Sequence, residues 1–417
     1  MSPAPTVLVI THNYPRERED QSGQFIQTLL LPLVGRYRFV VLAPHQAGLA
    51  EREDLQGITV VRFRYASEDD ETLAYEGNMH EQVLKSWSKR WLFLRFLKSL
   101  RAGVDGLIES ESPKLAHVHW WIPGALATAG LLARRRVPYI LTTHGSDLTL
   151  LDRFPIVRPV ARRLFRRAAS CTAVSTYLRD RLREHTGVDA AVLPMPYDDA
   201  KFRGLPPPPP GPPVITCVGR FIERKGQKHL LEACALLQAR GIDFRLWLVG
   251  DGPLRGELEQ MAARLSISDR VRFTGNVPHG SIPELYRDTT VAVLPSVRDW
   301  KGEVEGLGMV LAEASACARA VVGTDLAGVK DAVSHNDNGL LVPPADSGAL
   351  ADALARVLTE PGLSARLGQA GPRFAQERFS PASQSRKLAG IFDGILGAEK
   401  KVLHGFPGKA ARILRKK

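Results

Sequence analysis

The sequence predicts an α/β protein built from two doubly wound, parallel-sheet domains that face each other across a cleft. A chain of 417 residues is longer than a single hydrophobic core usually accommodates, so two domains are expected. Short, continuously apolar and β-branched segments alternate with helix-like stretches, which is typical of buried parallel strands covered by helices on both faces. The alternation occurs on both sides of a proline run, "LPPPPPGPP" at 205–213, which we expect to form an extended spacer.

The expected strands are short apolar runs in both halves of the chain. In the first half they lie at 6–11, 38–44, 58–63, 115–121, 138–145, 170–175 and 190–195. In the second half they lie at 214–219, 244–250, 271–275, 291–296, 319–324 and 339–343. Ligands of open α/β sheets bind beyond the carboxyl ends of the strands, so the residues just after each strand are the candidates for chemistry.

The pattern divides the chain into five segments. We expect an N-terminal domain at 1–205, a proline-rich linker at 206–213 and a second domain at 214–380. A helical pattern follows at 381–398, and a basic tail covers 399–417.

The composition indicates a protein of a reducing compartment with an anionic partner. Four scattered cysteines form no Cys-x-x-Cys pair, and neither a signal peptide nor a membrane-spanning segment is recognisable, so we expect a cytoplasmic protein. The net charge is +12, and 20 of the 56 Lys and Arg residues fall in three stretches without acid, at 82–104, 153–179 and 400–417. Such patches favour a membrane, a phosphorylated ligand or nucleic acid as partner.

Two loops of the second half offer groups suited to an anion. "GRFIERKGQ" follows a strand, with Gly219 allowing a tight exit and Arg220 and Lys225 supplying the two cations that a diphosphate needs. Ordinary solvated bases are the alternative. The turn "VGDGP" places Gly250 where backbone N–H groups approach an anion, although Gly-x-Gly also serves plain turns.

The stretch "VEGLGMVLAEASA" places two carboxylates around a helix start. Gly308 opens an apolar helix, Glu305 precedes it, and Glu313 lies about two turns along. Burying a carboxylate is costly unless it is paired, and a hydroxyl-rich ligand accounts for both glutamates. The alternative is that Glu313 pairs with a buried arginine and Glu305 is solvated.

These residues carry a resemblance to a known family. The ordered series "VGRFIERKGQ", "LVGDGP", "VRFTGNVP", "VLPS", "EGLGMVLAEASACARAVVGTDLAGVKDAV" and "NGLLVPP" resembles the nucleotide-sugar-binding half of the family 4 retaining glycosyltransferases. Their GT-B fold has two Rossmann-like domains, and the Glu-x7-Glu pair is their hallmark. The resemblance covers the second half densely and the first half more loosely. Arg319 stands where a glycine is usual in the family.

The resemblance implies roles for the second-half residues. Arg220 and Lys225 would hold the donor diphosphate and stabilise the leaving group, as preorganised charges do. Glu313 would bind the ribose and Glu305 the transferred sugar. Asn276 and Val277 would face the base, and the backbone of Leu307, Gly308 and Met309 would meet the phosphates or sugar. Gly219 and Gly250 would complete the donor site. The helix at 381–398 would cross back to the N-terminal domain.

The first half offers looser matches. In "YILTTHGSDL", a lone His144 is more often structural, but the matching family loop contributes a histidine to the donor sugar. Asp147 either orients an acceptor hydroxyl or, like Ser146, caps a helix. Gly23 in "QSGQF" matches a phosphate loop that often has two glycines. His119 lines either the acceptor cleft or the core.

The sequence therefore predicts a retaining hexosyltransferase that uses a nucleoside-diphosphate sugar and neither cofactor nor metal, since no Asp-x-Asp occurs. The acceptor would be a glycan, a lipid-linked saccharide or a glycosylated small molecule. The basic patches would dock it peripherally on the inner, anionic membrane face, with no nucleic acid expected. The alternatives are a basic membrane- or nucleic-acid-binding protein, and another GT-B enzyme such as a sugar-nucleotide epimerase or phosphorylase.

Overall fold

The structure, a computed structural model, describes residues 3–17, 20, 22–75 and 79–403. It divides into two compact units, each described here by itself. Unit 1 comprises residues 1–174, 178–193 and 384–417, and unit 2 comprises 175–177 and 194–383. The whole expected linker, 206–213, thus groups with unit 2, as do residues 194–205, which were expected in the N-terminal domain. Most of the C-terminal helix groups with unit 1.

Unit 1 contains an eight-stranded sheet in the order β3-β4-β2-β1-β5-β6-β7-β8. All neighbouring strands are parallel except β3 and β4. The strands are β1 Thr6–Ile10, β2 Arg38–Pro44, β3 Arg52–Leu55, β4 Ile58–Phe63, β5 Leu115–His119, β6 Tyr139–Thr143, β7 Ser170–Ala173 and β8 Ala191–Val192. Each strand expected in the first half is present.

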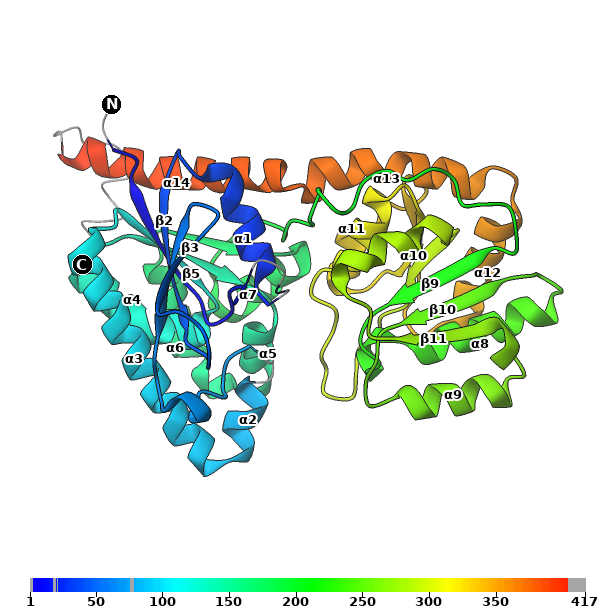
Figure 1. Cartoon of the computed structure of the whole chain (residues 1–417), viewed down its shortest axis with the longest axis horizontal. Coiled ribbons are helices and arrows are strands. Elements are labelled where there is room, and N and C mark those ends of the chain that lie inside the picture. Colours follow the sequence, from blue (N-terminus) through cyan, green and yellow to red (C-terminus); the bar gives the residue numbers. More distant parts are fainter. Residues whose placement is uncertain (1–2, 18–19, 21, 76–78, 404–417) are drawn as a thin grey trace. The chain divides into compact units, whose positions relative to one another are not determined.

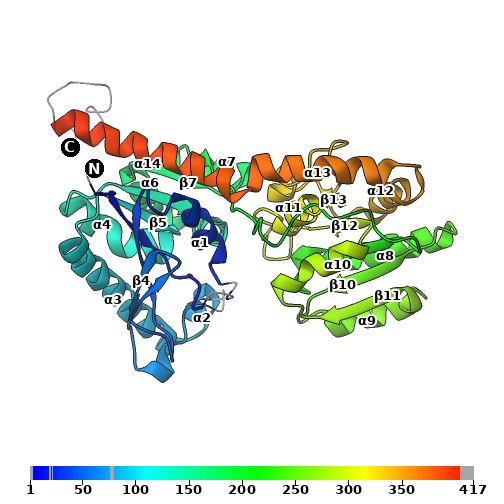
Figure 2. The same cartoon turned by 45° about the horizontal axis from the view of Figure 1, so that its top comes forward.

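Helices cover both faces of this sheet. They are α1 Gln24–Leu30, α2 Met79–Lys85, α3 Trp87–Glu111, α4 Leu126–Arg134, α5 Ser146–Arg153, α6 Arg158–Arg167, α7 Thr176–Thr186 and α14 Pro381–Leu403. Helices α1 and α14 pack on one face, where Phe392 joins the core around β1 and β2, and α3 contacts β1, β2 and β4 on the other (Figures 1 and 2). The segment expected as a C-terminal helix thus helps to build the unit 1 core.

Strand β3 was not expected from the sequence. It reads "REDL", carries no apolar alternation and lies half-exposed at the sheet edge. Its pairing depends on the turn at Gln56 and Gly57, both with positive φ, and the Gly57 amide donates to Asp54 Oδ1 at 2.8 Å. A charged edge strand lacks the alternation of apolar and polar residues by which strands are predicted from sequence.

Unit 2 contains a six-stranded, wholly parallel sheet in the order β11-β10-β9-β12-β13-β14. The strands are β9 Val214–Val218, β10 Arg245–Val249, β11 Val271–Gly275, β12 Val291–Leu294, β13 Ala320–Thr324 and β14 Gly339–Val342. The helices are α8 Gln227–Ala239, α9 Arg255–Arg264, α10 Ile282–Asp288, α11 Met309–Ala316, α12 Ser347–Thr359 and α13 Leu363–Phe379. All strands expected in the second half are present, so the predicted fold class is confirmed.

Two cores sandwich the unit 2 sheet. Helices α8, α9 and α12 pack on one face, against Ile215 and Leu246 among others. Helices α10 and α11 cover the other face, against Ala292 and Leu294 (Figure 1). Strand residues alternate between these two cores, as buried parallel strands require. All strands run the same way, so their carboxyl ends meet at one edge.

Arg319, the family departure, is a buried tether for the linker. Its guanidinium donates to the carbonyl oxygens of Tyr286 at 2.5 Å, Pro206 at 2.6 Å and Arg287 at 3.3 Å. It is among the largest fully buried side chains of the described residues. An arginine here therefore satisfies carbonyls that a glycine would leave to water.

The basic stretches take different forms. Residues 87–111, which include most of the basic stretch at 82–104, form α3, and this helix is partly buried through Phe96, Leu100 and Val104. The arginine-rich segment forms α6, whose arginines are largely exposed. The predicted basic tail lies outside the described residues from 404 onward. Among the described helices, none is long and apolar enough to cross a membrane.

We expect Arg319→Met to lower the free energy of unfolding by about 3 kcal/mol, because three carbonyls lose their donor. Arg366→Met is the matched control, since this exposed guanidinium donates to a single carbonyl, Asn336 O at 2.9 Å. It should change stability by about 0.5 kcal/mol or less. Urea unfolding of both variants checks the difference, and equal effects would contradict the tethering role.

Candidate active site

Three loops meet at the carboxyl edge of the unit 2 sheet, after β9, β10 and β11. Gly250 has φ 131°, and a Cβ atom on it would lie 2.3 Å from Gly219 O. The Gly250 amide donates to Gly275 O at 2.9 Å, next to the predicted base-binding residues. Of these, Asn276 is exposed and Val277 packs against the core. The predicted glycines therefore allow the loops to touch backbone to backbone.

The loop after β9 carries both predicted cations. Arg220 is exposed, whereas Lys225 is half-buried, with its side chain 3.5 Å from where a Gly219 Cβ would lie. Gly226 follows in the left-handed region, and a Cβ there would stand 1.9 Å from Pro295 O, beyond the end of β12. This contact draws the Lys225 loop against the loop that leads to Glu305.

Lys225 and Glu305 form the central ion pair of unit 2. The distance between Lys225 Nζ and Glu305 Oε2 is 2.5 Å. Burial by itself would raise the pKa of Glu305, but the Lys225 ammonium and the Gly306 amide lower it below its ordinary value. Glu305 is therefore ionised at neutral pH. The alternative of a solvated Glu305 is wrong.

The turn from Glu305 to α11 is held by a second loop. Gly308 is the N-cap of α11 with φ 75°. A Cβ atom on Gly328 would lie 1.9 Å from Gly306 O, and the Gly328 amide donates to Glu305 O at 3.2 Å. The first backbone N–H groups of α11, which begin at Met309, lack intrahelical partners and favour an anion at this end.

Glu313 is buried on α11 and pairs with a histidine that the sequence did not indicate. His279 Nε2 lies 2.9 Å from Glu313 Oε1. The His279 ring also packs on Phe202, with centroids 5.0 Å apart. Burial acts to lower the pKa of His279, but the Glu313 carboxylate outweighs it and the pKa lies above its ordinary value. In the alternative interpretation Glu313 paired with a buried arginine; the partner in the structure is a histidine.

Unit 1 places His144 in an aromatic cluster after β6. Its ring stacks on Trp120 with centroids 4.1 Å apart and lies 5.2 Å from Phe25. His119, buried at the end of β5, has its Nδ1 2.9 Å from His144 Nε2. Trp120 itself has φ 61°, a conformation rare for a bulky residue. Strained backbone of this kind concentrates at functional sites.

Burial keeps this histidine cluster neutral. It lowers the pKa of His12 to about 4 and that of His117 to about 3. It also takes the pKa of His119 and His144 well below the ordinary value, with like-charge repulsion from neighbouring histidines adding to the effect. At neutral pH, His144 therefore acts as a hydrogen-bonding imidazole and not as a cation.

The Asp147 carboxylate is fully engaged by its surroundings. Its Oδ1 accepts hydrogen bonds from Thr143 Oγ1 at 2.7 Å, Gly145 N at 3.0 Å and His144 N at 3.2 Å. Its Oδ2 accepts one from Trp121 N at 3.3 Å. Gly145, not Ser146 or Asp147, is the N-cap of α5. These contacts make Asp147 a residue that shapes the His144 loop, and its action on an acceptor stays a prediction.

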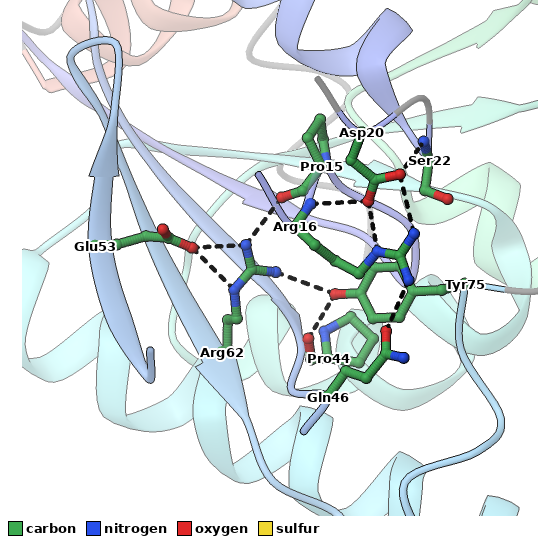
Figure 3. A network of polar contacts seen from close by, with 9 residues as sticks. All are labelled: Pro15, Arg16, Asp20, Ser22, Pro44, Gln46, Glu53, Arg62 and Tyr75. Atoms are coloured by element: carbon green, nitrogen blue, oxygen red, sulfur yellow. Dashed lines mark hydrogen bonds and ion pairs between the residues drawn. The ribbon is translucent and has the colours of Figure 1, made fainter. Parts of the chain in front are cut away.

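Gly23 lies against the turn after β1. It has φ 71°, and a Cβ there would stand 2.3 Å from Asn13 O. Before Gly23 in the chain, Arg16 has its Nε 2.5 Å from Asp20 Oδ2, and its Nη1 donates to Gln46 Oε1 at 3.1 Å (Figure 3). At Gly23 the predicted phosphate loop therefore lies in backbone contact with the turn after β1.

A second arginine, missed by sequence reasoning, braces the same loop. Arg62 has a fully buried side chain and donates to Pro15 O at 2.9 Å, Glu53 Oε1 at 2.7 Å and Tyr75 Oη at 3.1 Å (Figure 3). Tyr75 in turn donates to Pro44 O at 2.6 Å. In sequence, Arg62 was only one residue of an apolar strand, with no signal for this network.

Within the described ranges, no three His, Cys, Asp or Glu side chains are grouped to hold a metal ion. Transfer without metal or cofactor stays a prediction.

Comparison with known proteins identifies the family. Residues 198–374 match the model of glycosyl transferases group 1, and residues 23–201 match that of glycosyltransferase family 4. A mannosyltransferase of Mycolicibacterium smegmatis, GDP-mannose-dependent and acting on phosphatidylinositol monomannoside, is 31% identical over 64% of this chain and 74% of its own. The chain belongs to the family 4, group 1 glycosyltransferases. The resemblance seen in the sequence is confirmed, and of the enzyme classes left open, glycosyl transfer from a nucleotide sugar is supported.

Other relatives and solved structures agree. The α-D-kanosaminyltransferase of Streptomyces kanamyceticus is 29% identical over 75% of this chain and 84% of its own. Sucrose-phosphate synthase of Thermosynechococcus elongatus matches with a TM-score of 0.75, at 20% identity, over 94% of this chain and all of that one. HepE of Anabaena, solved with UDP-glucose, matches with a TM-score of 0.68 at 19% identity and the same coverage. At these identities the structures show the GT-B fold.

We expect the His279–Glu313 pair to stabilise unit 2 most at acid pH. Because the folded-state pKa of His279 is raised, its contribution is fully present below the unfolded pKa of about 6.5 and is lost as pH rises through the folded value. His279→Gln should therefore cost about 1 kcal/mol at pH 5.5 and less at pH 8.5, measured by thermal unfolding. In a Glu313→Gln background this pH dependence should vanish; a cost independent of pH would refute the pairing.

Proposed function

We propose that this glycosyltransferase moves a hexose, with retention of anomeric configuration and without a metal ion, from a nucleoside-diphosphate sugar to a hydroxyl of a glycan or lipid-linked acceptor. The observation that carries the proposal is the arrangement around the start of α11. Lys225 pairs with Glu305, the turn at Gly308 follows Glu305, and Glu313 lies on the helix that this turn opens. A diphosphate flanked by two hydroxylated groups needs such an order of cation, helix start and carboxylates.

The diphosphate is assigned to Lys225, Arg220 and the N-terminal end of α11. An ammonium and a guanidinium complement phosphate oxygens, and the free amides that follow Gly308 add a partial positive charge. These groups are in place before the leaving group develops its charge, so they stabilise the transition state without reorganisation. With these groups in place, the proposed reaction needs no ion.

The two carboxylates are assigned to hydroxyl groups. Glu313 has one oxygen held by His279 Nε2, which fixes the side chain and leaves its other oxygen for a ribose hydroxyl. Glu305 is assigned to hydroxyls of the transferred sugar. An ion-paired carboxylate is a weak nucleophile, so the Lys225 contact favours hydrogen bonding by Glu305 over covalent attack.

In the proposed reaction, the bond between the anomeric carbon and the diphosphate oxygen breaks, and a bond to the acceptor oxygen forms on the same face. The acceptor proton passes to the departing diphosphate, whose negative charge Lys225 and Arg220 balance. The role of His144 toward the transferred sugar stays a prediction.

The relatives indicate which donor nucleotides should be tested first. One named relative depends on GDP-mannose, and a structural neighbour was solved with UDP-glucose. UDP and GDP are therefore the first donors to test.

We expect one nucleoside diphosphate among UDP, GDP, ADP and CDP to raise the melting temperature. At a hundredfold excess over Kd, binding stabilises the folded state by about 2.7 kcal/mol. Glu313→Ala should remove most of this shift, while Glu284→Ala, a control on the exposed face of α10, should keep it. A shift that survives in Glu313→Ala would contradict the ribose assignment, and no shift with any nucleotide would contradict the proposed function.

Lys225→Ala should lower kcat by about 10²- to 10³-fold, because it removes a charge that acts on the leaving group. Lys228→Ala, an exposed lysine on the following helix, is the matched control and should leave kcat unchanged. Steady-state kinetics with the donor identified above measure both.

NMR of the product made by the unaltered enzyme gives its anomeric configuration; inversion would refute the proposed stereochemistry.

A further inference from the structure

Unit 1 contains an apolar pocket that takes no part in the donor site assigned above. It has a volume of about 280 Å³ and lies between the segment after β5, helices α2, α3 and α5, and the loop before α6. Phe93, Trp121, Leu150 and Phe154 are among its walls. This volume is near the lower end of the range for small-molecule sites, roughly 300 Å³. The walls are mostly hydrocarbon and aromatic, so the pocket suits an apolar occupant.

One end of the pocket is polar and adjoins the predicted catalytic histidine. His12 and Asn13 line it, and His12 Nδ1 and Asn13 Oδ1 are buried without a hydrogen-bond partner among the residues that the structure describes. The His12 ring lies 4.3 Å from Trp120, which stacks on His144. Buried polar atoms are normally satisfied, so these two mark a place where a ligand hydroxyl would find partners.

The apolar end of the pocket continues into exposed apolar side chains. Leu84 both lines the pocket and is exposed. On the adjoining segments, Trp87 is 76% exposed, Trp91 is 68% exposed and Ile156 is 87% exposed. Six of the ten large apolar side chains exposed in the described part of the chain lie within 84–94 and 156–160. Such clustering on a monomer surface marks an interaction site.

The same surface is strongly basic. We define the aromatic–basic surface as residues 84–101 and 153–167, which contain no acidic residue. Exposed cations on it include Lys85, Arg95, Lys98, Arg162 and Arg163. Tryptophan and cations side by side complement the interface of an anionic bilayer, where the indole sits at head-group level and the cations meet lipid phosphates.

We propose that the unit 1 pocket holds the hydrocarbon chain of a lipid acceptor that the aromatic–basic surface takes from an anionic bilayer. The hydroxylated head of that lipid would lie at the His12–Asn13 end, beside His144. This inference rests on the proposed function, since the occupant is the acceptor of the transferred sugar. It deepens that function by naming the acceptor as an amphiphile whose chain the protein itself binds.

Calorimetric titration of the full chain with hexyl, octyl and decyl β-D-glucosides, kept below their micelle concentrations, tests the pocket. We expect Kd to fall about fourfold per added methylene until the pocket is filled. Leu150→Trp, which fills the pocket, should weaken decyl glucoside binding at least tenfold. Leu236→Trp, at an exposed site of unit 2, is the matched control and should bind like the unaltered chain.

A second variant guards against misfolding of the first. Phe93→Ala enlarges the pocket and should keep binding while shifting the preference toward longer chains. Kd independent of chain length, or equal in Leu150→Trp, would overturn the proposal. Tighter binding of phenyl or naphthyl glucosides than of the alkyl series would also overturn it, assigning the pocket to an aromatic aglycone taken from solution.

The bilayer as source is tested by sedimentation with phosphatidylglycerol–phosphatidylcholine vesicles. Trp87→Ala combined with Trp91→Ala should reduce bound protein severalfold, whereas Trp300→Ala, at an equally exposed tryptophan of unit 2, should not. No sedimentation with vesicles would overturn the membrane source. A nucleotide-induced rise in melting temperature together with a failed alkyl series would overturn this inference alone. Alkyl-glucoside binding without any nucleotide-induced rise would overturn the proposed function, and with it the assignment of the occupant as an acceptor, while the apolar binding pocket itself would stand.

Discussion

The candidate donor site depends on backbone atoms of neighbouring loops touching at the carboxyl edge of the unit 2 sheet. A Cβ atom at Gly226, Gly250 or Gly328 would stand within 2.3 Å of a carbonyl oxygen of another loop. Any side chain there would push the loops apart. The 2.5 Å contact between Lys225 and Glu305 follows from this closeness, because the two residues lie on loops that Gly226 draws together. The glycines thus set the geometry, and the ionisable groups supply the chemistry.

The candidate site residues are ion-paired in unit 2, whereas the buried histidines of unit 1 are neutral. In unit 2, Lys225 offsets the effect of burial on Glu305 and keeps that carboxylate ionised, while Glu313 raises the pKa of His279. Ionised groups are therefore retained in the candidate donor site. In unit 1, His12, His117, His119 and His144 share one aromatic environment and are all neutral at physiological pH. Neutral imidazoles can direct hydroxyl groups without attracting the anion away from its cations. This division suits a reaction between an anionic donor and a hydroxylated acceptor.

Departures from ordinary backbone conformation and from the usual pairing of buried polar groups occur mainly around the histidine cluster of unit 1. Trp120 adopts a positive φ, several buried histidine nitrogens lack partners among the described residues, and Arg62 is buried within a strand. The buried arginine is compensated by carbonyls and a carboxylate, which hold Tyr75 and the turn after β1 (Figure 3). The histidines are compensated only in part: His119 Nδ1 and His144 Nε2 pair, but the other ring nitrogen of each has no partner within the described residues. Uncompensated departures of this kind mark functional surfaces in otherwise consistent folds.

By itself the sequence predicted both sheets except the edge strand β3, predicted the family, and singled out the strand-end residues from Gly219 to Glu313 as candidates. Strand alternation, glycine turns and a carboxylate in an apolar helix are local patterns, and a local pattern can be read without knowing what packs against it. Only the tertiary structure decided that His279 pairs with Glu313 across 34 residues and that Lys225 reaches Glu305 across 80. It also decided that Asp147 is engaged by backbone amides and that α3 and α5 enclose a pocket. These contacts depend on how elements far apart in the sequence pack together, and such packing produces no local sequence pattern from which it could be predicted.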